Sequence, residues 1–307
     1  MTNSKLYVVG SITVDLYFQG SSLNTNFGKF ELSIGGKYQV DKFATRIGGG
    51  GANVAITAKR MGISTTLISV IGQNSFSNLI RDDLNRYGIS DKYIISCENY
   101  NNISTILLSQ DGERTVLNYR TPHCQQKKMR EVLERLENGH LVSWIYFGGH
   151  LPDLSLADKA ILFHSLRAHK IKIALNLSRA ECEAGYEALS PLLAQTDLLI
   201  QNAHEFSNIL GKNYESVDLS QNHLSHLPAF MGDLVITDAQ NGSFAYSGDK
   251  VYKQKAIVPQ QIIDTTGAGD AFSGAYLAQI MQGSTIPDAL LSASTYVSKK
   301  LATFGAH

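Results

Sequence analysis

The sequence predicts one α/β domain with a mostly parallel sheet clothed by helices and a second, smaller sheet. From about residue 141, apolar stretches of strand length alternate with helical stretches, which is the βαβ pattern of a parallel sheet. Before that point, several strand segments alternate apolar and polar residues, as in a sheet covered on one side only. No repeat, low-complexity tract or Pro/Ser-rich linker divides the 307 residues, so we predict a single domain over residues 1–307.

The core elements are predicted from apolar runs and from the glycine and proline residues that end or begin them. Gly62 and Gly283 each end a helical stretch, and Pro287 opens the last one. That last helix carries its apolar residues on one face. The expected strands are Thr65–Ile71, Leu141–Phe147, Ile171–Leu175, Asp197–Ile200 and Leu234–Thr237, and the expected helices are Gly51–Met61, Leu156–His169, Glu183–Leu193 and Ala268–Gln282. Lys5–Val9 is expected as the first strand, with the alternating pattern of the other early segments.

The small sheet is expected from two separate segments, within about residues 12–45 and 104–119. Its second segment is a hairpin around Asp111-Gly112, a pair that supplies the positive φ of a type I′ turn. The expected strands are Ile12–Phe18, Phe30–Ile34, Tyr38–Thr45, Ser104–Gln110 and Glu113–Tyr119.

Composition narrows the classes of partner. Lys plus Arg and Asp plus Glu both number 27, so no net charge draws the chain toward nucleic acid or anionic lipid. No uninterrupted apolar stretch is long enough to span a membrane. The three cysteines, Cys97, Cys124 and Cys182, are sparse and odd in number, which argues against a disulfide framework. We therefore expect a cytoplasmic protein.

Several familiar chemistries have no motif here. The sequence contains no GxSxG, GxxxxGK[ST] or HExxH. His223 and His226 lie three apart on a stretch that reads as helical, and without a partner nearby they are interpreted as an exposed structural pair.

The segment DTTGAGD, residues 264–270, is the strongest functional signal. Gly267 and Gly269 stand where a helix begins, so backbone N–H groups and the positive end of the helix dipole face outward. Asp270 lies in the first turn, where it would accept a proton from an attacking hydroxyl if phosphate occupied the site. Taken alone, the segment is better interpreted as a capped helix in which Asp270 only interacts favourably with the helix dipole; the other motifs change that interpretation.

A run of four glycines, residues 48–51, is the second signal. Such a run is costly in backbone entropy, so close approach by a ligand or a hinge would explain it. Asn53 follows at the helix start and suits either a backbone cap or a hydrogen bond to a polyol. A plain flexible loop is the alternative.

Together with two further motifs, these segments resemble the ribokinase-like (PfkB) carbohydrate kinases over essentially the whole chain. The motifs are GSITVD at residues 10–15, the glycine run with Asn53, NAHE at residues 202–205 as the family's NxxE, and DTTGAGD. The resemblance implies a parallel core with helices on both faces and a β-sheet lid that closes over a sugar or nucleoside. It also implies that ATP phosphorylates a hydroxyl of that substrate.

Residue roles follow from the resemblance. Asp270 would be the general base. The remaining implied sets are the anion hole (Gly267, Ala268 and Gly269), the substrate-binding residues (Asp15, Gly49, Gly50 and Asn53), the nucleotide-binding residues (Asn202, Thr237 and Gly242), the Mg²⁺ residues acting through water (Glu205 and Asn202), and the residues for a monovalent cation such as K⁺ (Asp264 and Thr266). For Asp264, a turn cap is the alternative.

Departures from the family pattern leave the sugar unidentified. Ala239 stands where the family prefers glycine, and residues 72–77 lack the usual aspartate and final glycine of GxDxFG. Thr13 and Gly50 replace an asparagine and a lysine found in ribokinase itself, which weakens the case for ribose.

Two other functions stay open. One is a nucleoside kinase of the adenosine type, with Tyr119, Phe18 or Tyr38 stacking on a base, although such aromatics more often pack on each other. The other is a catalytically silent binding protein, against which the retained Asp270 and Glu205 argue. An exposed lid face would also allow a homodimer through the lid.

Overall fold

The structure is a computed structural model that describes residues 5–109, 113–121, 142–148, 154–303 and 305. Its centre is a nine-stranded sheet in the order β15-β14-β13-β12-β11-β10-β1-β6-β7. Neighbours from β13 to β7 pair in parallel, and the hairpin β14-β15 is antiparallel at one edge. The strands are β1 (Lys5–Val9), β6 (Ser64–Gly72), β7 (Ile94–Cys97), β10 (Val142–Phe147), β11 (Lys172–Leu175), β12 (Leu198–Asn202), β13 (Asp233–Thr237), β14 (Ser243–Ser247) and β15 (Lys250–Gln254).

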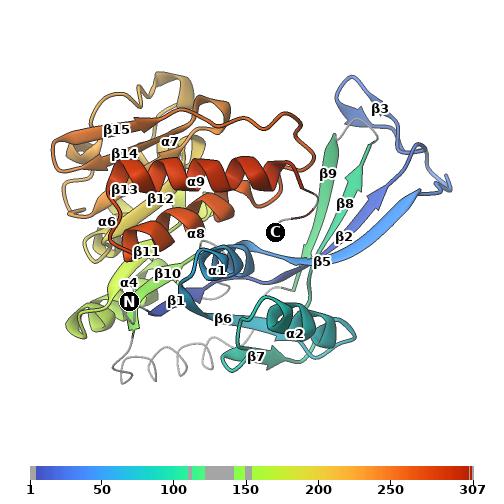
Figure 1. Cartoon of the computed structure of the whole chain (residues 1–307), viewed down its shortest axis with the longest axis horizontal. Helices are drawn as coiled ribbons and strands as arrows, with labels where there is room; N and C mark the ends of the chain where they lie inside the picture. The colour runs from blue at the N-terminus through green and yellow to red at the C-terminus, as the bar shows by residue number, and fades with distance from the viewer. Residues whose placement is uncertain (1–4, 110–112, 122–141, 149–153, 304, 306–307) are drawn as a thin grey trace.

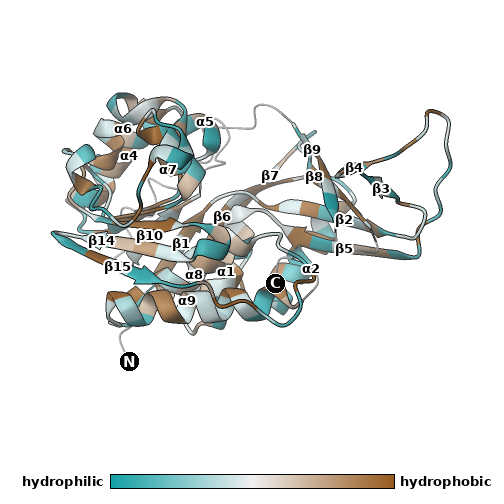
Figure 2. Ribbon diagram, turned by 90° about the horizontal axis from the view of Figure 1, so that it is seen from above, coloured by the Kyte–Doolittle hydropathy of each residue, from teal (hydrophilic) through white to brown (hydrophobic). Residues whose placement is uncertain are grey.

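Helices cover both faces of this sheet (Figure 2). On one face lie α1 (Gly50–Arg60), α2 (Phe76–Arg86), α8 (Ala268–Met281) and α9 (Ile286–Leu301); on the other lie α4 (Leu156–Ala168), α5 (Arg179–Cys182), α6 (Gly185–Leu193) and α7 (Ala203–Ile209). The sheet separates two cores. In β1, Leu6 and Val8 belong to the core with α1 and α8, while Tyr7 and Val9 belong to the core with α4 and α6. Burial on both faces explains why the parallel strands are apolar throughout, and it confirms the predicted fold class.

The small sheet projects from one end of the large one (Figure 1). Its order is β5 (Lys42–Gly48), β2 (Thr13–Gln19), β8 (Asn102–Leu108) and β9 (Arg114–Arg120). A two-stranded ribbon, β3 (Thr25–Asn26) with β4 (Lys29–Phe30), lies at its tip. The Asp111-Gly112 turn lies outside the described residues.

Some expected strands end elsewhere. Phe30–Ile34 is a strand only at Phe30, and Tyr38–Thr45 only from Lys42 onward, because residues 31–41 pair with no strand that the structure describes. Gly35, with φ of 75°, breaks the extended path there. Helices α2 and α7 and the hairpin β14-β15 were not expected from the sequence. Short 3₁₀ turns complete the described chain: η1 (Tyr214–Ser216), η2 (Leu224–His226) and η3 (Ala239–Asn241).

Only one residue of the histidine pair is exposed as expected: His226 is exposed, and His223 is not. His223 is buried, with its Nε2 2.9 Å from the Asp218 carbonyl oxygen and its ring edge-on to Tyr246. His226 lies in the 3₁₀ turn beside it. The apolar residues around His223 were too distant in sequence to reveal its burial.

The cysteines also differ from expectation. Cys97, the last residue of β7, is disulfide-bonded, whereas Cys182 is free and buried. The sequence argued against a disulfide framework and did not predict this bond, because spacing in the sequence does not report how closely two Cα atoms approach in the fold. Cys124 lies outside the described residues. Among the helices that the structure describes, none has the length and apolar character to cross a bilayer.

Candidate active site

Two cavities meet at the N-terminal turn of α8. The first, here called the apolar cavity, has a volume of about 330 Å³, and Ala268 and Gly269 form part of its wall. The second, here called the polar cavity, has a volume of about 300 Å³, and Asp270 forms part of its wall. One helical turn therefore borders both cavities, through Ala268 and Gly269 on one side and through Asp270 on the other. Both cavities lie at the carboxyl ends of the parallel strands, the usual place for ligands in open α/β sheets.

Helix α8 begins without a side-chain cap. Its N-cap residue is Gly267, which has φ of 70°, and no side chain accepts a hydrogen bond from the first turn. The Ala268 N–H donates to the Thr265 carbonyl at 3.3 Å. Gly269 has open space around the position of a Cβ atom. A helix end with this composition can receive an anion.

Asp270 is held by the start of α1. The Asn53 side-chain amide, itself buried, donates to Asp270 Oδ2 at 2.8 Å. Burial raises the pKa of Asp270, while the Asn53 hydrogen bond and the charge of Lys300 oppose that shift. The carboxylate is thus oriented and more basic than an exposed aspartate, which suits a proton acceptor.

The glycine run is an ordered part of this site. Gly49 is the N-cap of α1 with φ of 91°, and a Cβ atom there would lie 2.7 Å from the Ser11 carbonyl oxygen. A Cβ atom on Gly50 would lie 3.3 Å from Asp270 Oδ1. The alternative of a plain flexible loop does not explain these close approaches.

Asp15 lies on β2, on the face of the small sheet that is turned toward the α8 turn. Its register neighbours on this face are Arg46 on β5, Ser104 on β8 and, beyond Ser104, Asn118 on β9. Asp15 is only 4% exposed, and burial raises its pKa to about 7 despite a hydrogen bond with Ser104. A buried carboxylate near neutrality is a common feature of ligand sites.

The NxxE motif forms a capping box at the start of α7. The Glu205 N–H donates to Asn202 Oδ1 at 2.8 Å, and the Asn202 N–H donates to Glu205 Oε2 at 3.3 Å. Glu205 also lines the polar cavity together with Asp270. Burial raises the pKa of Glu205, and the negative charge of Asp270 adds to that shift. Asn202 and Glu205 therefore both have a structural partner, and both also line a cavity: Glu205 the polar cavity, and the two together a neighbouring one.

Thr237 and Gly242 both line the apolar cavity. Gly242 has φ of 99°, and a Cβ atom there would lie 2.1 Å from the Gln254 carbonyl oxygen. Ala239, in the same loop, has φ of 44°. Ala239 therefore occupies a left-handed conformation that glycine adopts more easily, which gives a physical reason for a glycine preference at this position.

Asp264 and Thr266 lie in the loop before α8, and the structure adds two residues to them. Lys300, buried on α9, donates to the Asp264 carbonyl oxygen at 2.9 Å. Arg114 of β9 lies 3.6 Å from Asp264 Oδ1 and also donates to the Thr265 hydroxyl. Sequence reasoning missed both basic residues. Lys300 had a signal, because it lies three residues after Val297 on the inward face of the last helix.

Metal-ligand clusters are absent from the described residues: no group of three or more His, Cys, Asp or Glu side chains there could hold a metal ion. The carboxylates that line the polar cavity are Asp270 and Glu205. A divalent cation bound here would therefore keep much of its own water shell, as Mg²⁺ prefers.

Comparison with known proteins agrees with this geometry. Residues 3–306 match the pfkB family of carbohydrate kinases. The chain is 23% identical over 307 residues to an ATP-dependent 6-phosphofructokinase of Thermoanaerobacterium thermosaccharolyticum, covering 97% of this chain and 88% of the relative. It is 24% identical over 303 residues to the ribokinase of Bacillus subtilis, covering 97% and 93%.

A solved structure of Arabidopsis thaliana ribokinase complexed with ribose and ATP superposes with a TM-score of 0.77 and 20% identity. That superposition covers 98% of this chain and 94% of the ribokinase chain. The chain therefore belongs to the pfkB family of carbohydrate kinases. It is a sugar kinase of the ribokinase-like type, a phosphotransferase with an alcohol group as acceptor.

Proposed function

We propose that the chain transfers the γ-phosphoryl group of ATP to a hydroxyl of a small sugar or sugar derivative. The observation that carries this proposal is the α8 turn between the two cavities, with Gly269 on the wall of one and Asp270 on the wall of the other. Phosphoryl transfer needs a donor and an acceptor held in line, with positive potential between them. The open start of α8 meets that requirement.

The apolar cavity is the proposed nucleotide site. Ile257, Val258 and Val297 offer apolar surface for a base, and Thr237 and Gly242 lie in the adjoining loop. A nucleotide seated there would direct its phosphates toward the N–H groups at Gly267, Ala268 and Gly269. Those groups would receive the charge that develops on the transferred phosphoryl group.

The polar cavity, bordered by Gly50 and Asp270, is the proposed place of the reacting hydroxyl. Asp15, Gly49 and Asn53 lie outside its lining, and together with Gly50 they would hold the other sugar hydroxyls. Asp270 would take the proton of the attacking hydroxyl, and Asn53 keeps its carboxylate turned in one direction. The small sheet would exclude water, which otherwise competes as acceptor.

Mg²⁺ is the proposed metal, near Glu205. Partial burial raises the pKa of the Glu205 carboxylate, and the negative charge of Asp270 adds to that shift, so a nearby cation would offset both effects. Glu205 and Asn202 would hold Mg²⁺ through water. When bound, the ion would neutralise phosphate charge.

A sugar is favoured over a nucleoside by the positions of the aromatic residues. Tyr119 pairs in register with Ile103 and so lies on the face of the small sheet opposite Asp15. Phe18 packs against Phe43 at a ring distance of 5.2 Å. The Tyr38 hydroxyl accepts the Ser33 N–H at 2.7 Å. These contacts do not gather a stacking platform at the acceptor cavity.

The outer face of the small sheet supports the proposed homodimer. Phe43, Leu117 and Tyr119 are exposed on that face, and a second copy could cover them. Sedimentation across a concentration series tests this point, and a monomer throughout would exclude it.

A transfer assay tests the proposed activity. We expect labelled phosphate to move from ATP, with Mg²⁺, to members of a panel of sugars, sugar phosphates and sugar acids more efficiently than to nucleosides. No transfer to any acceptor would favour the silent protein, and a nucleoside preference would favour the nucleoside kinase.

Asp15 gives this assay a pH signature. The pKa of Asp15 is raised to about 7, so its side chain becomes ionised as the pH rises through that value. The ionised carboxylate can accept hydrogen bonds from sugar hydroxyls. We expect the acceptor KM to fall over this rise. Asp15→Asn should have a higher acceptor KM without that pH dependence, and an unchanged KM for ATP.

A further inference from the structure

Asp264, the aspartate expected to bind a monovalent cation, has each of its three oxygens engaged by a protein donor. The Asp264 carbonyl accepts from the Lys300 ammonium at 2.9 Å. Its Oδ1 accepts the Thr266 N–H at 2.8 Å, and its Oδ2 accepts the Gly305 N–H at 3.1 Å. Asp264 is 3% exposed, so water does not compete at these atoms.

Two side-chain cations also converge on this loop. Lys300 is only 5% exposed, and a lysine is rarely buried so deeply unless it is paired. Arg114 reaches the same aspartate from the small sheet, with its Nη1 3.6 Å from Asp264 Oδ1. The charged groups that act on Lys300 are Asp264, Arg114 and Asp270. An added K⁺ ion would meet two positive charges here, so the donor set does not fit it.

The end of α9 fixes the loop further. The Leu301 carbonyl accepts the N–H groups of Ile263 and Asp264 at 2.8 and 3.3 Å. The loop is therefore bonded to the last turn of α9 in two ways: through the Lys300 side chain and through the Leu301 backbone carbonyl. The loop leads directly into the α8 turn, so its position sets that of Gly267.

We propose that Lys300 is a built-in cation that takes the place of a monovalent ion at the Asp264 loop, so that the kinase needs no K⁺. Lys300 is a positioning residue, because it contacts the Asp264 carbonyl and not the reacting groups. It braces the loop that orients the anion-binding turn of α8. The activity part of this inference rests on the proposed function, whereas its stability part does not.

Thermal unfolding of the full chain without ligands tests the binding of the ion. We expect the same Tm in KCl and in tetramethylammonium chloride at equal ionic strength. Lys300→Met should lower the Tm, and KCl should then raise it, because the oxygen left by the ammonium becomes available. Lys299→Met is the matched control, since Lys299 is exposed on the same helix, and its Tm should not depend on the salt.

Turnover in the same two salts tests the consequence for catalysis. We expect the parent kcat to agree within about twofold between them, and the Lys300→Met kcat to fall and to recover partly in KCl. A parent Tm or kcat that rises clearly with K⁺ overturns the proposal, as does a folded Lys300→Met variant that behaves like the parent. If Lys300→Met does not fold, the comparison of the parent protein in the two salts still tests the proposal. If no acceptor is phosphorylated, the proposed function is wrong, but the unfolding data still show whether the protein binds K⁺.

Discussion

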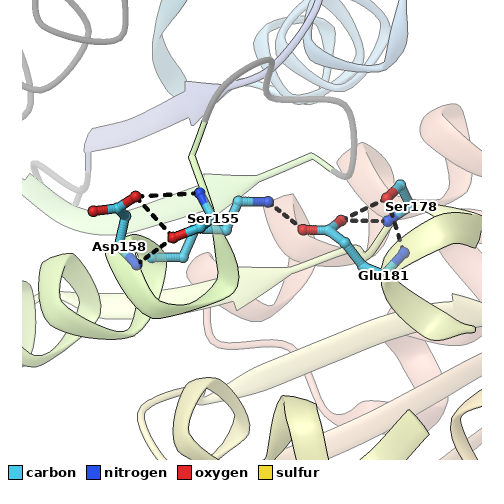
Figure 3. Close-up of polar contacts among 5 residues, drawn as sticks. Ser155, Asp158, Ser178 and Glu181 are labelled. Atoms are coloured by element: carbon cyan, nitrogen blue, oxygen red, sulfur yellow. Dashed lines mark hydrogen bonds and ion pairs between the residues drawn. The ribbon is translucent and has the colours of Figure 1, made fainter. Parts of the chain in front are cut away.

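Helices α4 and α8 both carry an aspartate in the third position of the helix, with different surroundings. In α4, Asp158 turns back to the N-cap: its Oδ2 accepts from the Ser155 N–H at 3.4 Å and from the Ser155 hydroxyl at 2.8 Å (Figure 3). The Ser155 Oγ in turn accepts the Asp158 N–H at 3.1 Å. In α8, Gly267 offers no such side chain, and Asp270 is held instead by Asn53 of another helix.

Helix α5 repeats the closed arrangement. Its N-cap Ser178 and Glu181 form a second capping box, and Lys159 of α4 contacts the Glu181 carboxylate (Figure 3). In these closed starts the carboxylate and the N–H groups satisfy each other. The open start of α8 leaves its donors and its carboxylate to a partner outside the helix. The comparison shows that the open start leaves Asp270 available to a partner outside its helix, whereas a closed cap does not by itself exclude a ligand role, because Glu205 closes a capping box and also lines the polar cavity.

Substitution of Asp270 should lower turnover far more than the same substitution of Asp158. Asp270→Asn keeps the size of the side chain and an oxygen for the Asn53 amide, but it removes the base. We expect kcat to fall by about 10²–10⁴-fold, while ATP still binds because a negative charge beside its phosphates is gone. Asp158→Asn is the matched control and should turn over like the parent. Steady-state kinetics with ATP titrations measure both variants. Parent-like turnover of Asp270→Asn would remove the assigned base.

Much of this comparison is visible in the sequence. Glycines at residues 267 and 269 predicted an open helix start, because no serine or asparagine stands at the cap. The parallel core also followed from its apolar strands. These features depend on local chemistry and on the pattern of neighbouring residues.

Features that depend on distant contacts were not predictable. The Lys300 contact with Asp264 joins residues 36 positions apart, and the exposed loop after Phe30 gave an alternating pattern without a partner strand. Likewise, NxxE was interpreted as a ligand motif, but its asparagine also closes a capping box. The sequence motif alone does not distinguish a capping role from a ligand role.

A substitution at Gly269, in the open start of α8, should change stability and activity in opposite directions. Gly269 has free space around it, so Gly269→Ala fits the helix and should raise the free energy of unfolding by about 0.5–1 kcal/mol. The same methyl group would enter the space proposed for phosphate. We expect kcat/KM for ATP to fall by about 10- to 100-fold. Denaturant unfolding and kinetics on one preparation measure both. An active, stabilised variant would show that the open helix start does not receive the nucleotide.

The smallest expected effect lies at the closed start of α4. Ser155→Ala removes the acceptor for the Asp158 N–H and a donor to the Asp158 carboxylate, and a lost cap of this kind costs about 1 kcal/mol. Ser155→Gly should cost only a few tenths, because water reaches the exposed N–H groups more easily past glycine. We expect the free energy of unfolding to fall in that order, measured by urea denaturation with equal m-values. Turnover should stay at the parent value in both variants, since nothing at this helix start faces either cavity in the described residues. If Ser155→Ala instead lowered kcat by more than its loss of folded protein explains, closed and open helix starts would not differ in function as proposed.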